Sequence, residues 1–104
     1  MPRPPQNVRR VAARALERRR RLRLENRNPG GTAVGVARAR DLAAGRKVSH
    51  RTLVRMRAFF DRWAGRYAEV ADDPDSPIAL AWALWGGTAG RRWVERVLRG
   101  KGIY

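Results

Sequence analysis

An uncharged apolar segment at residues 78–85 is the feature that most constrains how this chain folds. It reads Ile-Ala-Leu-Ala-Trp-Ala-Leu-Trp, in a chain of 104 residues with a formal net charge of +15. Together with Trp93 it brings three of the four tryptophans within twelve positions. Large aromatic side chains remove much apolar surface from water when they pack, and eight residues are too few to cross a bilayer, which takes about 20. We therefore predict a short core helix on which the other elements pack.

This apolar helix has clear boundary signals. Ser76 is placed to accept a hydrogen bond from the backbone as an N-cap, and Pro77 suits the first helical position. Gly86 can adopt the left-handed conformation that ends a helix. A last helix should then open at Thr88 or a neighbour and end at Gly100.

Two helices are predicted in the first half of the chain. A basic helix should start near Gln6 or Asn7, after an arm that holds three prolines. A second helix should cover residues 33–44, between an N-cap at Thr32 and a terminating Gly45. The apolar residues of this second helix are mostly small, which would let a neighbouring helix approach closely.

The third helix has the strongest pattern. Ser49 is a favourable N-cap, and Val48 and Leu53 occupy the two positions of a hydrophobic staple. Apolar residues recur at positions 53, 56, 60, 63 and 67 and give one wide apolar face, and an acidic loop should follow at residues 68–76. No alternating strand pattern of useful length occurs. We predict an all-α fold, a compact bundle of about five short helices with a basic N-terminal helix and arm.

Large side chains at helical spacing should form the core of this bundle. The predicted core residues are Met56, Phe60, Trp63, Trp82, Trp85 and Trp93. Aromatic residues can also stack on the bases of single-stranded nucleic acid, but helical spacing favours core packing. We divide the chain into a basic N-terminal arm and helix at residues 1–31 and a helical core domain at residues 32–104.

Arginine dominates the charge of the chain. Of the 24 basic residues 22 are arginines, and residues 1–31 hold ten of them with only two acids. Residues 68–87 hold four acids and no base, so one acidic segment could pair with a basic face of the same chain or of a neighbour. A surface this basic attracts polyanions, namely nucleic acid, acidic proteins or anionic membranes.

The first helix is the predicted polyanion- or partner-binding element. Its arginines are Arg9, Arg10, Arg14, Arg18, Arg19, Arg20, Arg21 and Arg23. The guanidinium fork binds phosphate and carboxylate equally well, so composition leaves DNA and acidic protein both open. The helix has no aromatic residue and only Leu and Val to bury, so a membrane surface is the least favoured partner.

Residues 37–57 suggest an alternative function, a helix-turn-helix DNA-binding regulator. In that interpretation His50, Arg51 and Arg55 would approach base edges in the major groove. The turn at residues 45–49 is longer than the common turn of three to four residues. An ordinary helical hairpin with a capped second helix is the plainer interpretation.

The residue types of an active site or a metal site are scarce. The chain has no cysteine and one histidine, His50, so a zinc site lacks ligands. His50 directly follows Ser49, and adjacent residues at a helix start do not by themselves form a nucleophile–base pair. The aspartates at positions 72, 73 and 75 lack the central glycine and terminal glutamate of a calcium loop. We expect no enzyme activity, no cofactor and no metal, and the absence of an apolar signal stretch predicts no secretion by that route.

Two segments resemble a small module of tailed-bacteriophage proteins. They read Gly-Val-Ala-Arg-Ala-Arg-Asp-Leu-Ala-Ala-Gly at residues 35–45 and Ala-Trp-Ala-Leu-Trp-Gly-Gly-Thr-Ala-Gly-Arg-Arg-Trp at residues 81–93. The module turns up alone and fused to virion-assembly proteins such as prohead proteases, and the likeness covers about residues 30–94. The chain departs from it at residues 61–63 and in a shortened loop before Ser76.

The resemblance implies a phage setting and no catalytic residues, because the module has no settled biochemical activity. We therefore expect a virion structural protein on the capsid, connector or tail, found in the virion and, during assembly, in the host cytoplasm. Its partners would be virion proteins with acidic surfaces, nucleic acid, or both, and not a membrane. We expect multiple copies in an assembly.

Overall fold

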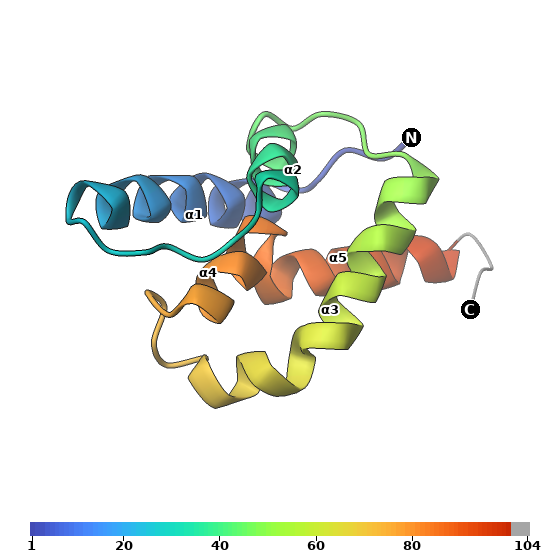
Figure 1. Ribbon diagram of the computed structural model, residues 1–104. Helices are drawn as coiled ribbons and strands as arrows, with labels where there is room; N and C mark the ends of the chain where they lie inside the picture. Colours follow the sequence, from blue (N-terminus) through green and yellow to red (C-terminus); the bar gives the residue numbers. More distant parts are fainter. Residues whose placement is uncertain (101–104) are drawn as a thin grey trace.

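The structure is a computed structural model that describes residues 1–100, and among them it contains five helices and no strand. The helices are α1 (Gln6–Leu24), α2 (Ala33–Ala43), α3 (His50–Val70), α4 (Pro77–Leu84) and α5 (Gly87–Gly100). Their arrangement is shown in Figure 1. The predicted all-α fold is confirmed.

The short helix α4 is the element on which the bundle is built, because it contacts each of the other four helices. It lies between α1 and α3 (Figure 1), which have no Cα atoms within 8 Å of one another. Its residues Ala79, Leu80, Trp82 and Leu84 are buried. The prediction that the other elements pack on this apolar segment is therefore confirmed.

Side-chain caps begin three of the helices as the sequence predicted. The hydroxyl oxygen of Thr32 accepts a hydrogen bond from the N–H of Gly35 at 3.2 Å. The hydroxyl of Ser49 accepts from the N–H of Thr52 at 3.2 Å. The hydroxyl of Ser76 accepts in the same way at the start of α4. Each cap satisfies a backbone donor that the helix itself leaves unpaired.

Left-handed residues end three helices. Gly45 has φ +70° directly after α2, and the N–H of Arg46 donates to the carbonyl of Asp41 at 3.1 Å, as in a Schellman ending. Asn26 ends α1 in the same manner with φ +58°. Gly86, predicted to end α4, has φ +105°.

Three helix boundaries differ from, or refine, the prediction. Helix α2 ends at Ala43 and not at residue 44. The acidic loop was expected at residues 68–76, but α3 continues to Val70 and the loop begins at residue 71. The ring of Tyr67 stacks on Trp82, with ring centroids 4.4 Å apart, and this contact holds the end of α3 on the core. The last helix begins at Gly87, next to the expected Thr88.

Four of the six predicted core residues are buried. Met56 and Phe60 are fully buried, and Trp82 and Trp93 are 3% and 5% exposed. Phe60 meets the Trp82 ring edge-on at 4.8 Å between centroids. The indole Nε1 of Trp82 donates to the hydroxyl of Thr88 at 3.2 Å, so the one polar atom of this ring has a partner.

Trp63 and Trp85 lie at the edge of the core and are only half-buried, contrary to the prediction. Trp63 lies at the margin of the contact between α3 and α4, beside Ile78 and Ala81, where α4 covers it only in part. Trp85 follows the last residue of α4 as its C-cap. Helical spacing predicted which face these residues share, but not how far the neighbouring helices extend over it.

The first helix belongs to the same hydrophobic core as the other four. Val8, Ala12 and Ala15 of α1 are fully buried, and Leu22 is 1% exposed. The boundary that we set at residue 31 therefore does not separate two hydrophobic cores.

The arm before α1 lies on the loop between α2 and α3. The carbonyl oxygen of Pro2 accepts a hydrogen bond from the N–H of Val48 at 2.8 Å. Arg3 donates to the carbonyl of Gly45 at 3.1 Å. The guanidinium of Arg9 also lies against Gly45, because a Cβ built there would be 2.8 Å from Arg9 Cζ. The arm is therefore hydrogen-bonded to the loop near both ends of the loop, at Gly45 and at Val48.

Candidate polyanion-binding surface

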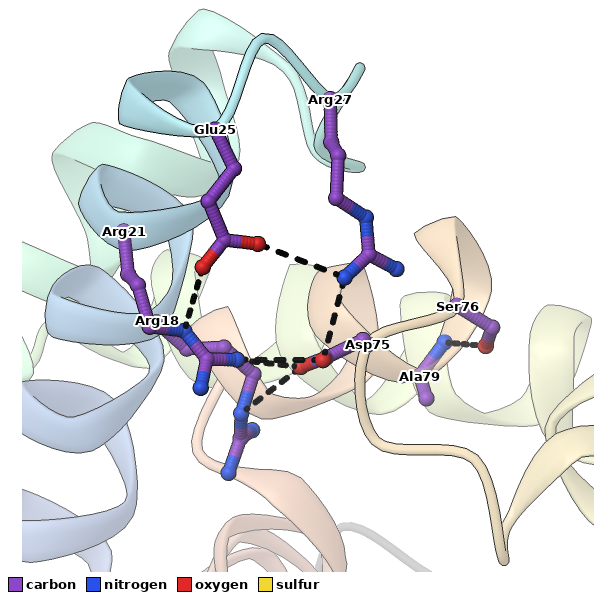
Figure 2. A network of polar contacts seen from close by, with 7 residues as sticks. All are labelled: Arg18, Arg21, Glu25, Arg27, Asp75, Ser76 and Ala79. Atoms are coloured by element: carbon purple, nitrogen blue, oxygen red, sulfur yellow. Dashed lines mark hydrogen bonds and ion pairs between the residues drawn. The ribbon is translucent and has the colours of Figure 1, made fainter.

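Asp75 is the centre of an ion-pair cluster that joins α1 to the start of α4 (Figure 2). Arg21 Nη2 donates to both carboxylate oxygens of Asp75, at 2.9 and 3.0 Å. Arg18 Nε lies 3.5 Å from Asp75 Oδ1, and Arg27 Nη1 lies 3.6 Å from Oδ2. The acidic segment therefore pairs with a basic face of the same chain, one of the two outcomes that the sequence allowed.

Glu25 extends this cluster on the α1 side. Its carboxylate lies 3.9 Å from Arg21 Nε and 3.6 Å from Arg27 Nη1, as Figure 2 shows. Arg18, Arg21 and Arg27 thus share the two carboxylates of Glu25 and Asp75, and the cluster keeps only a small excess of positive charge. Arg18 and Arg21, which were predicted to bind a partner, are largely neutralised within the chain.

The groove between α1 and α2 gathers four arginines, three of which lack an acidic partner among the described residues. It has a volume of about 530 Å³, and four of its lining residues are Arg19, Arg20, Arg23 and Arg40. Apolar residues of both helices complete the lining. Glu17 is the single acid of the groove, and its carboxylate lies 3.6 Å from Arg20 Nη1.

Three of these groove arginines, Arg19, Arg23 and Arg40, have no acidic partner among the residues that the structure describes. The Nε of Arg19 is buried and has no hydrogen-bond partner in the chain. A cationic N–H that is taken out of water without a partner costs free energy, and a nearby anion offsets that cost. The groove is therefore the part of the α1 surface best suited to a phosphate or carboxylate group.

The other predicted arginines of α1 are dispersed. Arg10 and Arg14 are exposed and have no acidic partner within residues 1–100. Arg14 lines a depression that also includes Arg20, so the basic surface continues along α1 from the groove. Arg9 is drawn away from this surface by its contact with Gly45.

Arg40 is a residue of the groove that the sequence analysis missed. It lies one helical turn after Val36, which also lines the groove. Two features of the sequence could have indicated it. The small residues of the second helix predict close packing on a neighbouring helix, and the four-residue spacing places Arg40 on the same helix face as Val36.

The residues proposed for DNA reading are accessible but lack the expected support. His50, Arg51 and Arg55 are exposed on the first turns of α3. However, α2 and α3, both wholly described, have no pair of Cα atoms within 8 Å of each other. The N-terminal arm also covers the loop that joins them. The helix-to-helix packing of a helix-turn-helix unit is thus missing.

Two further findings concern metal ions and membranes. Residues 1–100 contain no group of three or more His, Cys, Asp or Glu side chains able to hold a metal ion. None of the helices described is long and apolar enough to cross a membrane.

Comparison with known proteins adds no relative to this geometry. No family model matches the chain, and no significant match was found among curated proteins or among solved structures. The resemblance to the tailed-phage module therefore remains a prediction from the quoted sequence segments.

Proposed function

We propose that this chain is a non-enzymatic structural protein of a tailed-bacteriophage virion. It binds acidic faces of other virion proteins, packaged DNA, or both, through the arginines of α1 and α2. It is present in multiple copies on the capsid, connector or tail, and passes through the host cytoplasm during assembly.

The observation that carries the proposal is the groove between α1 and α2. Four arginines converge there on one partly paired acid, and the whole chain carries a formal net charge of +15. The planar guanidinium fork binds phosphate or carboxylate bidentately, so less conformational freedom is lost for each hydrogen bond formed. The phage setting is supported only by the two sequence segments described above.

Mass spectrometry of phage particles purified through a density gradient tests this function. The chain should be found in intact particles at a fixed ratio to the major capsid protein, and a high-salt wash should release it if its contacts are electrostatic. Detection in the infected lysate but not in purified particles would refute the virion assignment.

The helix-turn-helix regulator is the second candidate, and we do not favour it. Its recognition residues would need support from α2, and α2 packs on α1 and α4 instead. A regulator should bind one duplex sequence far better than a scrambled duplex. Equal affinity for the two duplexes would leave the polyanion-binding function as the better account.

A further inference from the structure

An apolar groove lies on the opposite side of α4 from α1, between α3 and α4. It has a volume of about 400 Å³ and is lined by Phe59 and Trp63 of α3, by Ile78 and Ala81 of α4, and by Trp85. Residues 30–32 of the loop between α1 and α2 also line it. A second depression of about 470 Å³ shares Phe59, Trp63 and Trp85 with it, so the two adjoin, and we call them together the hollow.

This hollow is open although the residues that line it are large and apolar. Phe59, Trp63 and Trp85 are all half-buried, whereas Trp82 beside them is 3% exposed. Apolar surface gathered in a concave site is typical of interaction sites. The +15 chain also has little reason to associate with itself, because like-charged copies repel.

The rim of the hollow is basic. Arg62 lines both of its parts, and Arg55 lines the second. Both side chains are exposed and have no acidic partner within the described residues. No acid lines either part of the hollow. Charge complementarity therefore calls for an acidic ligand that also carries an apolar group.

The ring contacts favour a polypeptide over a nucleic-acid base. The Phe59 and Trp85 rings are stacked on each other, with centroids 4.5 Å apart and planes 9° apart. The guanidinium of Arg38 also lies over Trp85, and that of Arg66 lies over Trp63. A base-stacking platform needs open ring faces, and here a neighbouring side chain already covers at least one face of each of these rings. A side chain inserted between α3 and α4 needs only the apolar volume.

From these observations we infer that the hollow between α3 and α4 binds an acidic segment of a partner protein, which inserts an aromatic or branched aliphatic side chain. Arg55 and Arg62 bind the carboxylates that flank this anchor. This site is separate from the groove between α1 and α2, and it does not depend on the phage setting. With both sites, one copy can hold a protein on one side and a polyanion on the other.

Selection from a displayed library of random peptides of about 12 residues tests this inference. The full chain is the target, and a counter-selection uses the Arg62→Glu variant. Enriched peptides should contain Trp, Phe, Leu or Ile next to Asp or Glu. In NMR titrations, the best of these peptides should shift the indole N–H signals of Trp63 and Trp85.

Variants separate the hollow from the rest of the basic surface. Affinity for the peptide should fall at least about tenfold in Arg62→Glu and in Trp63→Ala, as for an anchor contact at an interface. A control, Arg96→Glu, makes the same charge change at an exposed residue of α5 that lines neither part of the hollow, and it should alter affinity by less than about twofold, as expected of a charge distant from the contact. If circular dichroism shows that Trp63→Ala is unfolded, the affinity of Arg62→Glu alone tests the inference.

Several results would overturn the inference. They are a failure to enrich any peptide, enriched peptides without acids or without an anchor, and equal affinity for Arg62→Glu and Arg96→Glu. Tighter binding of oligothymidine at the same indoles would assign the hollow to single-stranded nucleic acid. Self-association that Arg62→Glu abolishes would assign it to a second copy.

Discussion

Replacing Asp75 by Asn should destabilise the fold through the loss of one ion-pair cluster. Asp75 is 26% exposed, accepts two hydrogen bonds from Arg21 at 2.9–3.0 Å, and lies 3.5–3.6 Å from Arg18 and Arg27. Exposed pairs contribute about 0.2–1 kcal/mol each. Since only Arg21 is at hydrogen-bond distance, we expect a total loss of about 1–2 kcal/mol. For a domain of this size that lowers Tm by roughly 4–16 °C.

Asp73→Asn is the matched control, because it makes the same charge change in the same loop. The Asp73 side chain is exposed and forms no ion pair within residues 1–100, so its replacement should cost less than about 0.5 kcal/mol. Urea denaturation at low salt and in about 1 M NaCl should show the difference between the two variants shrinking as the charges are screened.

A double-mutant cycle isolates the ion pair from other effects of Asp75, which also lies just before the N-cap of α4. Combining Asp75→Asn with Arg21→Ala should give a coupling energy of about 0.5–1 kcal/mol, since the two residues are in contact. Equal destabilisation by Asp75→Asn and Asp73→Asn, together with zero coupling to Arg21, would refute the reasoning that this cluster fastens α1 to α4.

Three further substitutions test the packing, each by urea denaturation. Trp82→Ala should cost about 3–5 kcal/mol, because it empties a buried site that Tyr67 stacks on; a loss below about 1 kcal/mol would contradict the central place of this ring. Gly30→Ala should cost about 1–3 kcal/mol, since its Cβ would overlap the carbonyl of Pro77, and an unchanged midpoint would refute that close approach. Ser49→Ala should cost about 0.5–2 kcal/mol by removing a cap, whereas Ser49→Thr, which keeps a hydroxyl, should cost clearly less.

The helix ends could be predicted from the sequence because their determinants are local. The hydroxyl of Ser76 reaches a backbone N–H three residues away, and the left-handed φ of Gly45 and Gly86 follows from their lack of a Cβ. Burial of Trp82 was also predictable, since an uncharged segment of eight residues in so basic a chain has few other uses. These features depend on short stretches of sequence and little else.

The candidate site could be predicted only in part, because its contacts join distant segments. Asp75 and Arg21 are 54 positions apart, and no local pattern indicates which of eight arginines an acid will meet. Arg40 enters the groove only because α2 packs on α1. The exposure of Trp63 depends on how far the other helices extend over α3. The residue composition does not indicate how the helices are arranged.

The most direct test of the account measures how salt weakens binding to a DNA duplex of about 20 base pairs, and to polyglutamate in parallel. The groove variant is Arg23→Ala with Arg40→Ala. The matched control is Arg92→Ala with Arg96→Ala, a pair exposed on α5 that has no acidic partner within the described residues. Each variant has two fewer positive charges than the unmodified chain.

If the groove between α1 and α2 binds the polyanion, the groove variant alone should bind more weakly. Its slope of log Kd against log salt for DNA should fall by about 0.9 for each phosphate that the variant no longer engages, and the control should match the unmodified chain. Equal weakening in the two variants would mean that net charge, and not this groove, determines binding. No binding of either polyanion at low salt would contradict the account outright.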